Sequence, residues 1–132
     1  MCLCYAITKA NMQAMTTKNL NKPFYAWKVI NAKTLRSPYR RSAMWIPGKL
    51  MRRRSIAKTP IIHPVVGCTG YENGIHLLLT RVAARDYVKS LRYRPTVSFK
   101  AIKVLVNPQS VVAWGRETGK PVVVVRSCRI CE

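Results

Sequence analysis

Acidic residues are nearly absent from this chain of 132 residues, which has 24 Lys and Arg against 4 Asp and Glu. Paired-acid hydrolysis, magnesium-dependent phosphoryl transfer and nuclease metal sites each need two or more carboxylates that converge. We therefore expect that the protein is not an enzyme. The whole supply of carboxylates is Glu72, Asp86, Glu117 and Glu132.

Long apolar segments are missing as well. No stretch approaches the roughly 20 apolar residues that cross a bilayer. Lys9, Asn11 and Gln13 interrupt the mildly apolar N-terminus, so it lacks the clean apolar run of a secretion signal. A glycine-rich phosphate loop of the Walker or dinucleotide type is also missing. We expect a protein that is not secreted, has no membrane partner and uses no nucleotide cofactor.

What the chain has instead is positive charge, with a net value of +20. The first carboxylate is Glu72, and all 13 Lys and Arg residues before it have no acidic residue among them. A surface with so few counter-ions of its own is typical of proteins that bind a polyanion. The expected partners are nucleic acid or an acidic protein.

The apolar pattern predicts an α+β domain with a small, mostly antiparallel sheet, one main helix and a long basic loop. We expect residues 1–22 to form an N-terminal arm and residues 23–132 a single domain. Within residues 1–22 a short helix is expected at 7–15. The expected strands are 24–30, 75–79, 97–106 with a bulge at Ala101-Ile102, 111–114 and 122–130.

The main helix is expected to run from Arg81 to about Tyr93, after Thr80 as its N-cap. Its apolar stripe has helical spacing, and a second stripe of basic residues lies beside it. The apolar stripe is Ala84, Tyr87, Val88 and Leu91, and the basic stripe is Arg81, Arg85, Lys89 and Arg92.

Residues 40–64 are expected to form an irregular basic loop, because Pro47-Gly48, Pro60 and Pro64 oppose a helix there. Its Arg side chains suit phosphate because the planar guanidinium donates two parallel hydrogen bonds. No nucleic-acid reading motif is present, so we expect contact with backbone phosphates without sequence specificity. The predicted binding residues are Arg40, Arg41, Lys49, Arg52, Arg53, Arg54, Lys58, Arg81, Arg85, Lys89 and Arg92. Arg116, Lys120, Arg126 and Arg129 could extend this surface.

Five cysteines are an odd number and predict reduced thiols rather than a disulfide framework. If the two chain ends are neighbours, Cys2, Cys4, Cys128 and Cys131 could hold one tetrahedral zinc ion. The alternative is that these are buried or unligated thiols. His76 is expected to be a satisfied core or loop histidine.

The order of short motifs resembles that of small uncharacterised proteins of bacteriophages and large DNA viruses. The resemblance spans residues 24–130 and implies a small α+β module in a viral setting, without implying an activity. This chain departs from the pattern by being much more basic. The motifs are 24–30, Leu35-Arg36-Ser37-Pro38-Tyr39-Arg40, Trp45-Ile46-Pro47-Gly48-Lys49, 72–80, Ala83-Ala84, Tyr87 and Val111-Val112-Ala113-Trp114.

These observations predict a non-enzymatic basic viral protein that binds nucleic acid and lies in the virion or in the cytoplasm or nucleus of the host cell. An alternative is a minor capsid or scaffold protein that docks on acidic capsid subunits. A third is an antagonist of host defence that sequesters a nucleotide, which would require a defined pocket.

Overall fold

A computed structural model describes residues 3, 5–37, 44–53, 58–65, 68–91 and 97–131, with the backbone alone for 58–65 and 68–69. The strands are β1 Tyr5–Ala6, β2 Phe24–Asn31, β3 Leu50–Arg52, β4 Lys58–Val65, β5 Cys68–Glu72, β6 Ile75–Leu78, β7 Phe99–Val106, β8 Val111–Glu117, β9 Lys120–Val125 and β10 Ser127–Ile130. The helices are α1 Lys9–Thr16, α2 Arg81–Ser90 and the 3₁₀ turn η1 Pro108–Ser110.

The prediction of a small sheet with one main helix and a long basic loop is wrong. The described chain forms an eight-stranded antiparallel sheet in the order β1-β8-β9-β6-β2-β7-β10-β3, a separate β4–β5 pair and two short α-helices. The expected irregular loop at 40–64 contains β3 and most of β4. Pro60 and Pro64 are tolerated in β4 because this strand has only one partner, so a missing amide donor can face outward.

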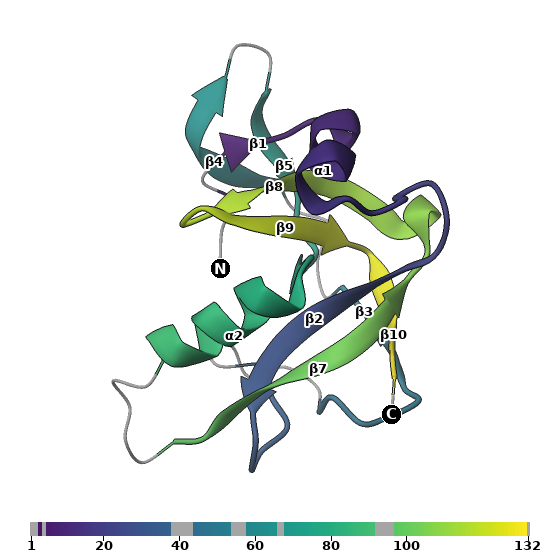
Figure 1. The fold of residues 1–132 in the computed structure, drawn as a ribbon, viewed down its shortest axis with the longest axis vertical. Helices are drawn as coiled ribbons and strands as arrows, with labels where there is room; N and C mark the ends of the chain where they lie inside the picture. Colours follow the sequence, from purple (N-terminus) through teal and green to yellow (C-terminus); the bar gives the residue numbers. More distant parts are fainter. Residues whose placement is uncertain are drawn as a thin grey trace.

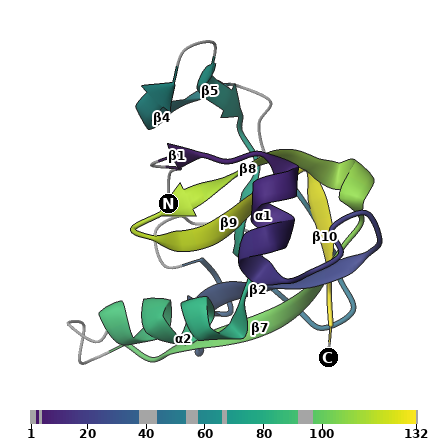
Figure 2. The same ribbon diagram turned by 45° about the horizontal axis from the view of Figure 1, so that its top comes forward.

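Residues 120–130 form two strands rather than one. Arg126 separates β9, which pairs with β6 and β8, from β10, which pairs with β7 and β3. Its amide donates to the carbonyl of Ser110 (2.8 Å) and its carbonyl accepts from the amide of Arg53 (2.7 Å). Because β6, β2 and β7 lie between β9 and β10 in the sheet, the sheet must curl. In Figure 2, β8 and β9 lie above β2 and β7, and β10 runs down one side.

The inner face of this curled sheet holds the larger core. Alternating residues of the strands point inward, and Met12 of α1 and Leu20 of the following loop pack with them. The strand residues of this core include Phe24, Ala26, Ile30, Leu77, Val104, Val106, Val123, Val125, Cys128 and Ile130.

Helix α2 covers part of the outer face and forms a second core with it. Thr80 caps the helix as predicted, and its Oγ1 accepts a hydrogen bond from the amide of Ala83 at 3.1 Å. The helix ends at Ser90, three residues earlier than expected. Its buried residues Ala83, Ala84, Tyr87 and Leu91 pack with Val29, Leu78, Val122 and Val124 of the sheet.

Residues of the segment 1–22 pair and pack with the rest of the chain. Tyr5 and Ala6 of β1 pair with Arg116 and Gly115 of β8. Leu3 is 1% exposed in the second core. Gly115 permits this close approach, because a Cβ on it would lie 2.3 Å from the carbonyl oxygen of Tyr5. Figure 1 shows β1 beside β8, with α1 packed next to them.

Candidate nucleic-acid interface

The outer face of β2, β7, β10 and β3 is open to solvent where α2 does not cover it. Tyr25, Leu105, Arg129 and Leu50 are register partners across these four strands and form one row. The three apolar members of the row are 46%, 37% and 38% exposed, in the order Tyr25, Leu105, Leu50. We call this surface the open sheet face, made of Lys18, Tyr25, Trp27, Leu50, Arg52, Lys103, Leu105 and Arg129.

Strand alternation explains the composition of the open sheet face. Met51, Val104 and Cys128 point into the larger core, so the residues beside them in sequence point outward. These outward residues are large and apolar or cationic, and none of the eight is a carboxylate. Exposed apolar side chains gathered with charges of a single sign mark an interaction surface rather than a solvated face.

Two lysines from different elements contact Tyr25, one at its ring and one at its carbonyl oxygen. Lys103 of β7 places Nζ 4.0 Å from the ring centroid. Lys18, from the loop after α1, donates a hydrogen bond to the carbonyl oxygen of Tyr25 at 2.9 Å and lies 4.8 Å from the centroid of Trp27. Burial and the neighbouring charge of Lys103 both lower the pKa of Lys18. The two ammonium groups therefore repel each other beside an exposed aromatic ring.

Two arginines extend the positive charge toward β3. The Arg129 guanidinium donates to the carbonyl oxygen of Gly48 at 3.1 Å, which anchors it between β10 and the Pro47-Gly48 turn. Arg52 is exposed, and its register partner Ser127 lies on the same face as Arg129. Among the described residues, neither these arginines nor the two lysines form an ion pair. Their charges are therefore available to bind an anion of another molecule.

The structure separates the predicted binding residues into several groups. Arg52 lies on the open sheet face and exposed Lys49 lies beside it, whereas Arg53 pairs with Glu72 at 3.2 Å. The α2 cations Arg81, Arg85 and Lys89 are exposed on the helix. Arg40, Arg41, Arg54 and Arg92 lie outside the described residues, as does the side chain of Lys58.

The sequence reasoning missed Lys18 and Lys103. The predicted bulge at Ala101-Ile102 is wrong, because β2 and β7 pair without a shift from Phe24↔Val106 to Asn31↔Phe99. Regular alternation along β7 puts Lys103 on the same face as Leu105, the register partner of Tyr25. The signal was therefore present as the regular alternation of β7. No local signal indicates that Lys18 folds back onto β2.

The four cysteines of the predicted zinc site are described only in part. Cys128 is buried in the larger core, and burial raises the pKa of its thiol to about 12. Cys131 is partly buried and follows the end of β10, and its charge also raises the pKa of Cys128. Within the described part of the chain, no three Cys, His, Asp or Glu residues converge. Cys2 and Cys4 lie outside it, so the zinc site stays a prediction.

His76 is a core histidine, one of the two structural placements, core or loop, that were expected for it. It is 9% exposed, and its Nε2 lies 2.7 Å from Oη of Tyr71. The amide of Leu3 donates to the same Oη at 3.2 Å. This hydrogen-bonded chain ties the start of the protein to β5 and β6, which is a structural role.

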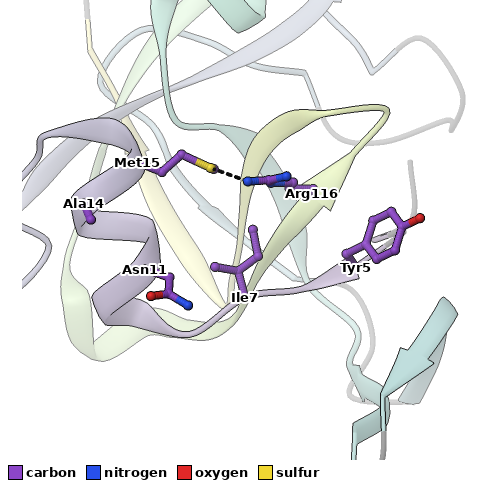
Figure 3. A pocket seen from close by; sticks show the side chains of 6 residues that line it. All are labelled: Tyr5, Ile7, Asn11, Ala14, Met15 and Arg116. Atoms are coloured by element: carbon purple, nitrogen blue, oxygen red, sulfur yellow. Dashed lines mark hydrogen bonds between the residues drawn. The ribbon is translucent and has the colours of Figure 1, made fainter.

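A separate groove of about 630 Å³ lies between α1 and the β1–β8 edge (Figure 3). The Arg116 side chain reaches across it and donates to Sδ of Met15 at 2.9 Å. The polar side chains of the lining are the Tyr5 hydroxyl, the Asn11 amide and the Arg116 guanidinium. Its residues are Tyr5, Ile7, Asn11, Ala14, Met15 and Arg116.

No protein-family model, curated protein or solved structure matches the chain. Neither α-helix of the described residues has the length and apolar character that a membrane crossing requires.

Proposed function

We propose that this protein is a non-enzymatic nucleic-acid-binding protein that contacts backbone phosphates. The observation that carries the proposal is that Lys18, Lys103, Arg129 and Arg52 lie together on the open sheet face. None of the eight residues of this face is a carboxylate. The net charge of +20 adds long-range attraction for any polyanion.

Phosphate suits these four cations for a chemical reason. An arginine fork donates two hydrogen bonds to one phosphate, and a lysine supplies a compact charge that adjusts its position. Each phosphate that is neutralised releases condensed counter-ions, and this release drives binding at low salt. We place the activity in a virion or inside an infected cell, the setting that the resemblance to viral proteins implies.

A second candidate is a minor capsid or scaffold protein that docks on acidic capsid subunits. The exposed Leu50 and Leu105 favour it, because apolar side chains on a charged surface are common at protein interfaces. Such a protein would bind its acidic partner more tightly than nucleic acid of equal charge.

The test is fluorescence anisotropy with a labelled 20-base-pair DNA between about 50 and 500 mM salt. Four phosphate contacts at a slope of about −0.9 each predict a log–log salt slope of about −3.6 or steeper. The variant Lys103→Glu/Arg129→Glu should bind at least about tenfold more weakly, with a slope shallower by about 2.

The matched control is Lys33→Glu/Lys100→Glu, which changes the net charge equally. Both lysines are exposed, and they lie near the far end of β2 and β7 from Tyr25. Equal losses in the two double variants would contradict the assignment of the open sheet face. Tighter binding to an acidic polypeptide than to DNA would favour the capsid-docking candidate.

A further inference from the structure

The most exposed aromatic residue of the open sheet face lies within its cluster of cations. Tyr25 is 46% exposed on β2, with Lys103 against its ring and Lys18 at its carbonyl oxygen. Its register partner Leu105 pairs in turn with Arg129 on β10. The hydroxyl of Tyr25 can donate to a phosphate as the cations do, whereas its ring adds a flat apolar surface that suits the face of a base.

We propose that the open sheet face binds single-stranded nucleic acid, with one base stacked on Tyr25 and its neighbouring phosphates on Lys103 and Arg129. This inference rests on the proposed function and specifies its ligand. A single strand offers its base faces to an aromatic ring, whereas a duplex keeps them inside its own stack.

The contact of Lys103 with the ring does not prevent stacking. A cation over an exposed ring contributes about 2- to 5-fold to an equilibrium constant. Stacking of a base on an aromatic side chain contributes about 5- to 150-fold. A base can therefore displace the ammonium group from the ring, and the flexible lysine stem lets that group move to an adjacent phosphate.

The repulsion between Lys18 and Lys103 supports an anion at this position. Burial and the charge of Lys103 lower the pKa of Lys18 in the unbound protein. A phosphate between the two ammonium groups would turn this repulsion into attraction. Lys18 is held at the carbonyl oxygen of Tyr25 before any ligand arrives, so only the Lys103 side chain has to move on binding.

The row of partners has the right length for a short stretch of strand. From Tyr25 to Leu50 it crosses three strand spacings of about 4.8 Å, or roughly 14 Å. A strand that lays its bases on the sheet is more extended than the roughly 3.4 Å per nucleotide of a stacked strand, so the row matches fewer than about four nucleotides. The exposed side chains of Leu105 and Leu50 offer apolar contacts to sugars and bases beyond Tyr25.

The experiment compares three labelled ligands by anisotropy, each over the same salt series from about 50 to 500 mM. They are a 20-residue oligothymidylate, an abasic strand with the same number of phosphates, and a 20-base-pair duplex. Wild-type protein should bind the oligothymidylate about 5- to 150-fold more tightly than the abasic strand. This comparison needs no substitution and therefore does not depend on the folding of a variant.

The variant Tyr25→Leu removes the aromatic face and keeps a large apolar side chain on the strand. It should weaken oligothymidylate binding about 5- to 150-fold and change abasic and duplex binding less than about twofold. The matched control Tyr25→Phe keeps the ring and should bind as the wild type does. Thermal melting checks that both variants fold.

The outcomes separate this inference from the proposed function. Equal, salt-dependent binding of wild-type protein to the oligothymidylate and the abasic strand would overturn base stacking and leave phosphate binding standing. An unchanged oligothymidylate affinity in folded Tyr25→Leu would overturn it too. Absence of salt-dependent binding to all three ligands would overturn the proposed function along with it.

Discussion

Substitution of Gly115 by alanine tests how the N-terminal segment is held on the sheet. A Cβ at this position would lie 2.3 Å from the carbonyl oxygen of Tyr5 and 2.9 Å from both Cδ atoms of Leu3. Ordinary van der Waals contacts begin near 3.4 Å. The clash with the Tyr5 carbonyl involves backbone, so a side-chain rotation cannot relieve it and β1 has to move by about 1 Å or more.

The cost follows from what β1 holds in place. If β1 moves away, Leu3 loses its burial, which is worth about 1.5–3 kcal/mol. If β1 stays, overpacking costs about 1–3 kcal/mol. We therefore expect Gly115→Ala to lower the free energy of unfolding by about 2–3 kcal/mol. For a chain of this length the Tm should fall by roughly 6–18 °C.

The assay is thermal unfolding followed by circular dichroism, with two reference variants. Gly48, unlike Gly115, has a positive φ, of 79°, and no atom lies within 4 Å of its added Cβ. Gly48→Ala therefore measures backbone strain without a clash, about 1–2 kcal/mol. Leu3→Ala combined with Gly115→Ala should cost less than the sum of the single variants, because both act on the same contact. A Tm of Gly115→Ala within 1 °C of the wild type would refute this account of the β1–β8 contact.

Three further predictions concern buried titratable groups and metal. Burial raises the pKa of Cys128 to about 12 from 9.0, so the unfolded state ionises first and stability is lost as pH rises from about 9 to 12. The free energy of unfolding, measured with urea, should therefore fall with pH more steeply for the wild type than for Cys128→Ala, by about 1.4 kcal/mol per pH unit. Parallel curves for the two proteins would contradict the raised pKa of Cys128. Burial raises the pKa of Glu117, and its Oε2 has no hydrogen-bond partner within the described structure. Glu117→Gln should therefore raise the Tm at pH 7, where it removes a buried charge, but not at pH 4, where the carboxyl is largely neutral. An equal change of Tm at the two pH values would mean that the substitution acts through packing. If Cys2, Cys4, Cys128 and Cys131 hold zinc, metal analysis should find one zinc per chain and a chelator should lower the Tm. A protein that contains no metal and is equally stable would contradict the zinc site.

Elements with strong local signals could be predicted from the sequence. Thr80 before a helical apolar stripe placed α2 to within three residues, because capping and amphipathicity are properties of neighbouring residues. The strands at β2, β6 and β7 were located for a similar reason, since aromatic, β-branched and other apolar residues cluster within each of them. The two-residue strand β1 and the three-residue strand β3 are too short to show any period.

Some features of the candidate site could likewise be predicted from the sequence, and others could not. The net charge of +20 predicts a polyanionic partner without any knowledge of the fold, because so few carboxylates cannot neutralise it. The density of arginine near residue 52 predicts that this segment binds phosphate. Yet Arg53 lies against Glu72, and only Arg52 of the triplet is described on the open sheet face. The density of arginine in the sequence could not reveal which cations lie together in the folded protein.

The sequence by itself determined the sign of the charge, the scarcity of catalytic carboxylates and the places where helix α2 and the longer strands form. These properties depend on composition or on residues a few positions apart. The tertiary structure alone decided that the chain bends at Arg126 and that Lys18 and Lys103 come together at Tyr25. Curling of the sheet and the choice of strand partners are set by contacts between residues far apart in the chain, whereas alternation within a strand sets only which face each side chain takes.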